Sequence, residues 1–151
     1  MSLQDWLREG HLRPQTTNRQ EIRQLLAVFE RDISDARIEG LSTDRKFAIA
    51  YNAALMMARA GLAACGYQTS GKANHYWAIR SLEFSIQVGE NTIRKLDAFR
   101  RKRNLTNYEI SGAVSEIEAE EMLALAIDLR DQLEAWLKRE YPSLLSHPDS
   151  H

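Results

Sequence analysis

The residues best suited to chemistry in this sequence lie in a basic segment at positions 93–112. As far as position 108, the segment carries six lysines or arginines and a single acid. An arginine can bind phosphate through paired hydrogen bonds, an amide adds polar contacts, and a phenol ring can stack on a nucleobase. Arg103, Asn104 and Tyr108 supply these three groups, and Arg100 adds phosphate affinity. The sequence therefore predicts a nucleotide-binding site at these four residues.

The spacing of these residues sets a condition on the backbone. Each residue of a helix turns by about 100°, so Arg103 and Tyr108, five positions apart, would point about 140° away from each other. Asn104 and Tyr108 are four positions apart and would share a face. We therefore predict a helix break between Arg103 and Tyr108, or a cluster formed between two subunits at a symmetric interface.

A simpler interpretation treats the basic run as a solvated helix end. Cations near a helix C-terminus interact favourably with the helix dipole, which accounts for most of the charges. It accounts less well for Arg103, because the apolar positions Ile93, Leu96 and Phe99 continue at helical spacing into this arginine. Under this alternative, Arg103 and Asn104 hold a helix junction together, and the protein is an interaction module without a nucleotide site.

The sequence lacks the patterns of several other common sites. No glutamate precedes a histidine by three residues, as a di-iron bundle requires, and no Walker pattern, glycine-rich phosphate loop or serine nucleophile elbow occurs. The acidic residues at 116–121 suit the first turns of a helix. Cys65 is the only cysteine, so there is no intrachain disulfide and no cysteine metal cage. We expect neither a metal nor a cofactor.

The composition indicates which elements must position the site. The three prolines are at positions 14, 142 and 148, so residues 15–141 contain none, which is typical of helices. The net charge of −1 gives no global basic field. The charged N-terminus is unlike a signal peptide, and no apolar stretch approaches the roughly 18–20 residues of a membrane helix. We expect a cytoplasmic protein without membrane contact.

Apolar residues at helical spacing predict four to five main helices. The predicted helices cover residues 18–39, 43–65, 73–88, 90–103 and 115–141. Asn18 and either Ser42 or Thr43 are expected caps, and Ser115 with Glu118 matches a capping box. Many small residues on the second helix predict close approach of a neighbouring helix.

The predicted fold class is all-α, an antiparallel up-and-down bundle without strands. We divide the chain into an N-terminal extension (1–17), a helical bundle domain (18–141) and a flexible C-terminal tail (142–151).

Several motifs resemble a known family in their order and spacing. They are Asp35-Ala36-Arg37, Leu41-Ser42, Phe47 to Tyr51 with Ala53-Ala54, Gly66-Tyr67, His75, and Arg100-x-x-Arg103-Asn104-x-x-x-Tyr108. Together they resemble the HEPN family (higher eukaryotes and prokaryotes nucleotide-binding), in its bacterial stand-alone branch, and the resemblance covers about residues 20–137. HEPN domains are small four-helix domains often found beside minimal nucleotidyltransferases.

The resemblance implies roles for the basic signature. Catalytic HEPN members are metal-independent ribonucleases that act as dimers through an Arg-x(4–6)-His motif. By this resemblance Arg103 is the motif arginine, Asn104 is its polar companion, and Tyr108 stands in place of the histidine. A tyrosine with its ordinary pKa near 10 is a poor general base at neutral pH. We therefore expect RNA or nucleotide binding rather than efficient catalysis.

If the protein does cleave RNA, the resemblance implies attack of a 2′-hydroxyl on the adjacent phosphate. Arg103 would stabilise the developing negative charge, and Tyr108 would position or protonate a reacting oxygen. His75, at the start of another helix, is an alternative source of the missing imidazole; a capping or surface role is its other interpretation.

The resemblance also implies partners. We expect a homodimer, and a toxin–antitoxin role with an antitoxin or a small nucleotidyltransferase as partner. In the latter case Tyr108 would be a candidate for nucleotide attachment.

Overall fold

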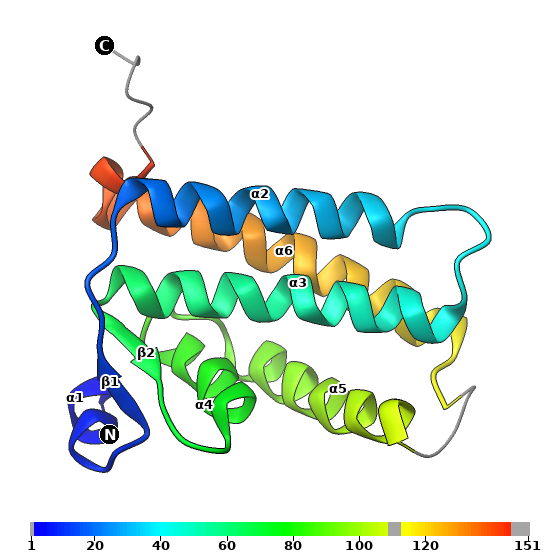
Figure 1. Ribbon diagram of the computed structural model, residues 1–151, viewed down its shortest axis with the longest axis horizontal. Helices are drawn as coiled ribbons and strands as arrows, with labels where there is room; N and C mark the ends of the chain where they lie inside the picture. The colour runs from blue at the N-terminus through cyan, green and yellow to red at the C-terminus, as the bar shows by residue number, and fades with distance from the viewer. Residues whose placement is uncertain (1, 109–112, 146–151) are drawn as a thin grey trace.

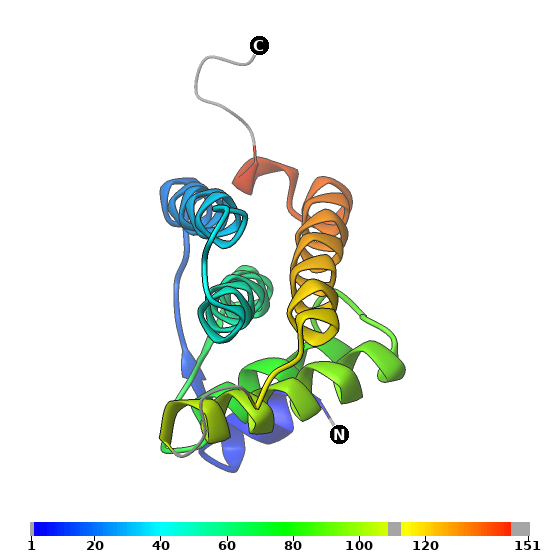
Figure 2. The same cartoon turned by 90° about the vertical axis from the view of Figure 1, so that its right-hand side faces the viewer.

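The computed structural model of the chain describes residues 2–108 and 113–145, without the side chains of 105–108. Four long helices run alternately in opposite directions: α2 (Arg19–Ala36), α3 (Thr43–Ala64), α5 (Glu90–Tyr108) and α6 (Glu116–Glu140) (Figure 1). In a view nearly along α2 and α3, α3 lies among α2, α6 and α5, and α5 runs across the view (Figure 2). The predicted all-α antiparallel bundle is therefore confirmed.

The central position of α3 explains its composition. Its alanines, among them Ala50, Ala54 and Ala58, are buried and leave room for neighbouring helices. An added Cβ at Gly61 would lie 3.3 Å from the Ser85 hydroxyl oxygen, so the backbone there is closely covered. The close approach of neighbouring helices predicted for this helix is confirmed by its packing against α2 and α6. Among the residues described, α3 is the one helix long and apolar enough to cross a membrane, but 72% of its most apolar window is buried in the bundle, as in a soluble protein's core helix.

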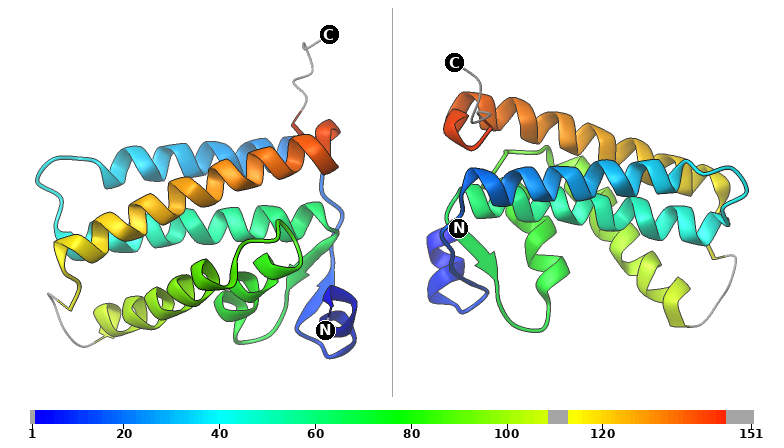
Figure 3. Two further views of the ribbon diagram at one scale, coloured as in Figure 1. Left: turned by 180° about the vertical axis from the view of Figure 1, so that it is seen from behind. Right: turned by 45° about the horizontal axis from the view of Figure 1, so that its top comes forward.

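Short elements surround one end of α3. Helix α1 (Leu3–Arg8) leads into strand β1 (Leu12–Pro14), which pairs antiparallel with β2 (Tyr67–Thr69). Helix α4 (Asn74–Arg80) and a 3-10 turn (Ser81–Glu83) follow β2. The small sheet lies between α1 and α4 (Figure 3).

The N-terminal segment packs against α4 through aromatic side chains. The ring centroids of Trp6 and Trp77 lie 4.9 Å apart, and His11 stacks on Trp77 at 3.7 Å. These contacts fix the position of α4, which carries residues of the site described below.

Three predictions about local structure were wrong. The helix predicted over 73–88 ends at Arg80, although its apolar spacing continues. The chain turns there through a 3-10 segment, at the start of which the Ser81 hydroxyl donates to the Ala78 carbonyl (2.6 Å). The predicted absence of strands fails at β1 and β2, whose three residues each are too few to reveal alternation. The first helix ends at Ala36, before the predicted residue 39.

The C-terminal segment begins with a second 3-10 turn (Pro142–Leu144). The remainder of the predicted flexible tail, from residue 146, lies outside the described residues.

The predicted helix caps are confirmed. The Asn18 side chain accepts a hydrogen bond from the Glu21 amide (2.9 Å), and the Ser42 hydroxyl accepts one from the Arg45 amide (3.3 Å). Ser115 and Glu118 form the full capping box at the start of α6. Each cap satisfies backbone amides that have no partner within the helix.

Ser115→Ala is expected to lower the free energy of unfolding by about 1 kcal/mol, because it removes the cap of α6. Urea unfolding would measure this change. Ser34→Ala, at an exposed position inside α2, is the matched control and should cost nothing, since alanine is the better helix former. An equal loss in both variants would contradict the capping explanation.

Candidate functional site

A cavity of about 310 Å³ opens where α3, α4 and α5 meet. Four of its side chains are cationic or can become so: Arg59, Lys72, His75 and Arg100. No carboxylate is among the described residues that line it, and the remaining polar lining is Asn74, Tyr76 and Asn104. A cavity with this lining suits an anion.

Arg59 is the most unusual residue of this cavity. It is half-buried on α3, and it is the one charged residue of positions 47–71. Within the described part of the chain it makes no hydrogen bond or ion pair. A partly buried guanidinium without a protein partner is costly unless a ligand or water satisfies it.

Tyr51 and His75 form a pair behind the cavity. The Tyr51 hydroxyl lies 3.3 Å from His75 Nδ1. Tyr51 is only 1% exposed, and this burial raises its pKa to about 12, so the phenol keeps its proton. The phenol can then donate to Nδ1, which leaves the proton of a neutral imidazole on Nε2.

The pKa of His75 is lowered, first by burial and then by the positive charges of Arg59, Arg103 and Arg100. Both burial and neighbouring cations disfavour the imidazolium form. His75 is therefore neutral near pH 7 in the free protein.

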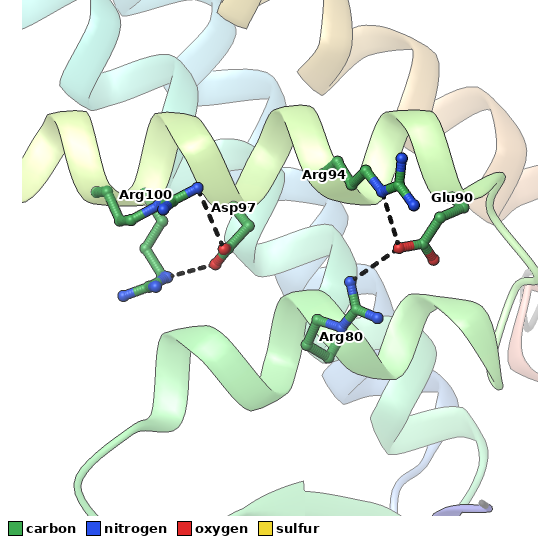
Figure 4. A network of polar contacts seen from close by, with 6 residues as sticks. Arg80, Glu90, Arg94, Asp97 and Arg100 are labelled. Atoms are coloured by element: carbon green, nitrogen blue, oxygen red, sulfur yellow. Dashed lines mark hydrogen bonds and ion pairs between the residues drawn. The ribbon is translucent and has the colours of Figure 1, made fainter.

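Arg100 and Arg103 each lie over an aromatic ring. The guanidinium carbon of Arg100 is 5.4 Å from the centre of the Tyr76 ring, and that of Arg103 is 5.5 Å from the Tyr51 ring. Arg100 Nε also donates to Asp97 (2.8 Å), as Figure 4 shows. Stacking and pairing hold Arg100 in place at the cavity wall.

Most of the remaining basic run on α5 is paired with acids. Arg94 and Arg80 both contact Glu90 (Figure 4), while Arg101 lies 3.8 Å from Asp97. The acidic run of α6 contributes further ion pairs: Lys95–Glu121 (2.7 Å), Lys102–Glu118 (2.6 Å) and Lys46–Glu120. The run does not form a helix C-terminus, because α5 continues to Tyr108 and has no basic residue in its last turn. Its charges are instead balanced by acids within the protein, so they need no nucleotide to explain them.

The predicted site residues separate in the structure. Arg100 and Asn104 line the cavity together, whereas Arg103 packs against Tyr51. The predicted helix break between Arg103 and Tyr108 was wrong: α5 continues to Tyr108, because no proline or glycine interrupts it. Tyr108 is the last residue of α5, and its side chain lies outside the described residues.

Sequence reasoning missed part of the cavity. Arg59, Lys72, Asn74 and Tyr76 were not predicted as site residues, and His75 was only an alternative. The available signal for Arg59 was its isolation, since a single charge in a long uncharged stretch requires an explanation.

Comparison with models of protein families, with curated proteins and with solved structures found no match to this chain. The resemblance to the HEPN family thus stays a prediction from the motifs.

Proposed function

We propose that the protein is a HEPN-like RNA-binding protein whose cavity between α3, α4 and α5 holds a phosphate group of the RNA. The observation that carries this proposal is the half-buried Arg59, which lines the cavity without a hydrogen bond or ion pair to the described residues. Arg100 and Lys72 line the same cavity and supply further positive charge. Charge-assisted hydrogen bonds to phosphate are strong where water is partly excluded.

The polar groups around the cations fit the same ligand. His75 would present its Nε2–H as a donor, because the Tyr51 hydroxyl occupies Nδ1. Asn104 would contribute polar contacts beside Arg100. An imidazole in this tautomer donates to a phosphate oxygen and has no free lone pair to act as a general base. This supports binding over turnover, and a weakly catalytic relative of the HEPN ribonucleases is the lesser candidate.

The paired charges of α5 and α6 favour a second candidate, a helical interaction module without a nucleotide site. The two candidates differ in whether the wild-type protein binds RNA at all. The homodimer, the cytoplasmic location and an antitoxin or nucleotidyltransferase partner remain predictions that accompany the HEPN resemblance.

Arg100→Gln is expected to weaken binding of a fluorescein-labelled RNA tetranucleotide about tenfold, because one charge-assisted contact of about 1.5 kcal/mol is lost. Fluorescence anisotropy at fixed salt would measure the affinity. Competition by adenosine monophosphate in the same assay separates a preference for RNA from binding of free nucleotides.

Arg130→Gln is the matched control for Arg100→Gln. The Arg130 side chain is 21% exposed, as is that of Arg100, and its guanidinium carbon lies 5.2 Å from the centre of the Phe29 ring. It also forms ion pairs, with Glu30 and Asp131, but lies on α6 and is not among the described cavity residues. Equal losses in the two variants, or no RNA binding by the wild type, would overturn the proposal.

A further inference from the structure

A second cavity, of about 410 Å³, adjoins the first one. The two share Arg59 and Asn74 as lining residues, so these side chains lie where the cavities meet. The far side of the second cavity is formed by β2 and by the segment that leads from β1 into α2. A ligand bound at Arg59 therefore has room to extend toward the small sheet.

The second cavity differs from the first in charge. It contains the carboxylate of Glu21, which accepts hydrogen bonds from the Gln15 amide and the Thr17 hydroxyl, each at 2.7 Å. Arg13 and Arg59 also line this cavity, so its lining is mixed in charge, and a second phosphate close to Glu21 would be repelled by the carboxylate. Groups that donate hydrogen bonds, such as an exocyclic amine or a sugar hydroxyl, would be favoured.

The rest of the lining suits a flat, polar ring. Tyr67 offers an aromatic ring, and Leu25 and Leu62 offer apolar contacts. The Gln68 amide, whose oxygen accepts from Arg13 at 3.3 Å, still has its own NH₂ group to donate. Small-molecule sites combine apolar walls with a few polar groups in this way.

Asn74 supplies an independent observation at the junction of the cavities. Its side-chain oxygen is buried and has no hydrogen-bond partner among the described residues. Leaving a buried acceptor unsatisfied costs about 1–3 kcal/mol, which a donor on a ligand could offset.

We propose that the second cavity holds the nucleoside whose phosphate lies at Arg59. This inference rests on the proposed function and deepens it: the site takes a whole nucleotide unit of the RNA, with the phosphate toward α5 and the base and sugar toward β2. Asn74 accepts a hydrogen bond from the nucleoside, and Gln68 contacts the base.

The test compares two tetranucleotides of equal charge, one of adenosine and one abasic. The wild type is expected to bind the adenosine ligand about tenfold more tightly, a difference typical of one stacked base. Gln68→Ala should reduce this preference and leave the affinity for the abasic ligand unchanged. Thr69→Trp, which fills the second cavity, should abolish the preference. Circular dichroism melting would verify that both variants are folded.

Gln132→Ala is the matched control for Gln68→Ala, because Gln132 also forms one side-chain hydrogen bond but lies on α6. Equal affinity of the wild type for the two tetranucleotides would overturn this inference and leave the proposed function standing. So would an unchanged preference in the folded Thr69→Trp and Gln68→Ala variants. Failure to bind either ligand would overturn both.

Discussion

Arg59→Gln is expected to weaken RNA binding about 100-fold, the largest effect of any single substitution considered. Two charge-assisted hydrogen bonds to phosphate contribute about 1.5 kcal/mol each, and about 1.4 kcal/mol corresponds to a factor of ten. Arg59 lines both cavities, so its loss removes the contact that joins the phosphate to the rest of the site. Anisotropy titration with the labelled tetranucleotide would measure the change.

The same substitution should leave the free energy of unfolding unchanged or slightly raised. Arg59 forms no ion pair or hydrogen bond with the described residues, so none is lost. Its positive charge also acts on His75 and Tyr51, beside Arg100 and Arg103, so removing it relieves repulsion among the arginines. Urea unfolding would measure this.

Arg59→Lys is the conservative control. Lysine keeps the charge but cannot form the paired hydrogen bonds of a guanidinium, so an intermediate affinity is expected. If Arg59→Gln unfolded more easily and bound RNA as tightly as the wild type, Arg59 would be a structural residue and the phosphate site would be wrong.

Arg103 is a less informative position than Arg59 for this test. Its guanidinium packs on the ring of the buried Tyr51, whose hydroxyl in turn contacts His75. Arg103→Ala would therefore disturb the protein interior and the site together. The sequence favoured Arg103, because it belongs to a motif and Arg59 does not. It could not show that Arg103 packs on a buried ring while Arg59 lines the cavities.

The fold was predictable because its signals are local. Asn18, Ser42 and Ser115 each begin a helix by capping amides within three residues, and this chemistry can be read directly from the sequence. The end of α4 was not predictable in this way. Ala78, Leu82 and Ile86 are all buried and keep a helical spacing, although the chain leaves the helix at Arg80.

The site was only half predictable because packing assembles it. Arg100 and Asn104 are near each other on α5, and their shared segment attracted attention. Arg59 and His75 join them only because α3 and α4 pack against α5. Two other cations of α5, Lys95 and Lys102, are balanced by acids from α6, so their pairing also depended on the tertiary structure.

RNA affinity is expected to rise as the pH falls from about 8 to 6, by up to about tenfold per pH unit where one proton is taken up. His75 has a lowered pKa in the free protein because of burial and of Arg59, Arg103 and Arg100. A phosphate in the cavity offsets these cations and favours imidazolium, so binding takes up a proton at Nδ1, and the Tyr51 hydroxyl then turns from donor to acceptor. Anisotropy titrations across this pH range would measure the slope.

Stability should change with pH in the opposite direction to affinity. The pKa of His75 in the folded protein lies below its value near 6.5 in the unfolded chain. In the pH window between these two pKa values, the unfolded chain therefore binds more protons than the folded one. This contribution to stability is therefore lost as the pH falls through that window. Tighter RNA binding at low pH therefore cannot result from a higher free energy of unfolding, because the contribution of His75 to that free energy falls as the pH falls.

His75→Gln should remove most of the pH dependence of binding while preserving a hydrogen-bond donor at the site. His11→Gln is the control, because His11 is not among the described residues of either cavity. Its stacking on Trp77 helps to hold α4, so the absolute affinity can fall, but the pH slope should stay that of the wild type. The same slope in His75→Gln as in the wild type would show that another group titrates. A flat profile in the wild type would mean that the phosphate does not lie beside this imidazole.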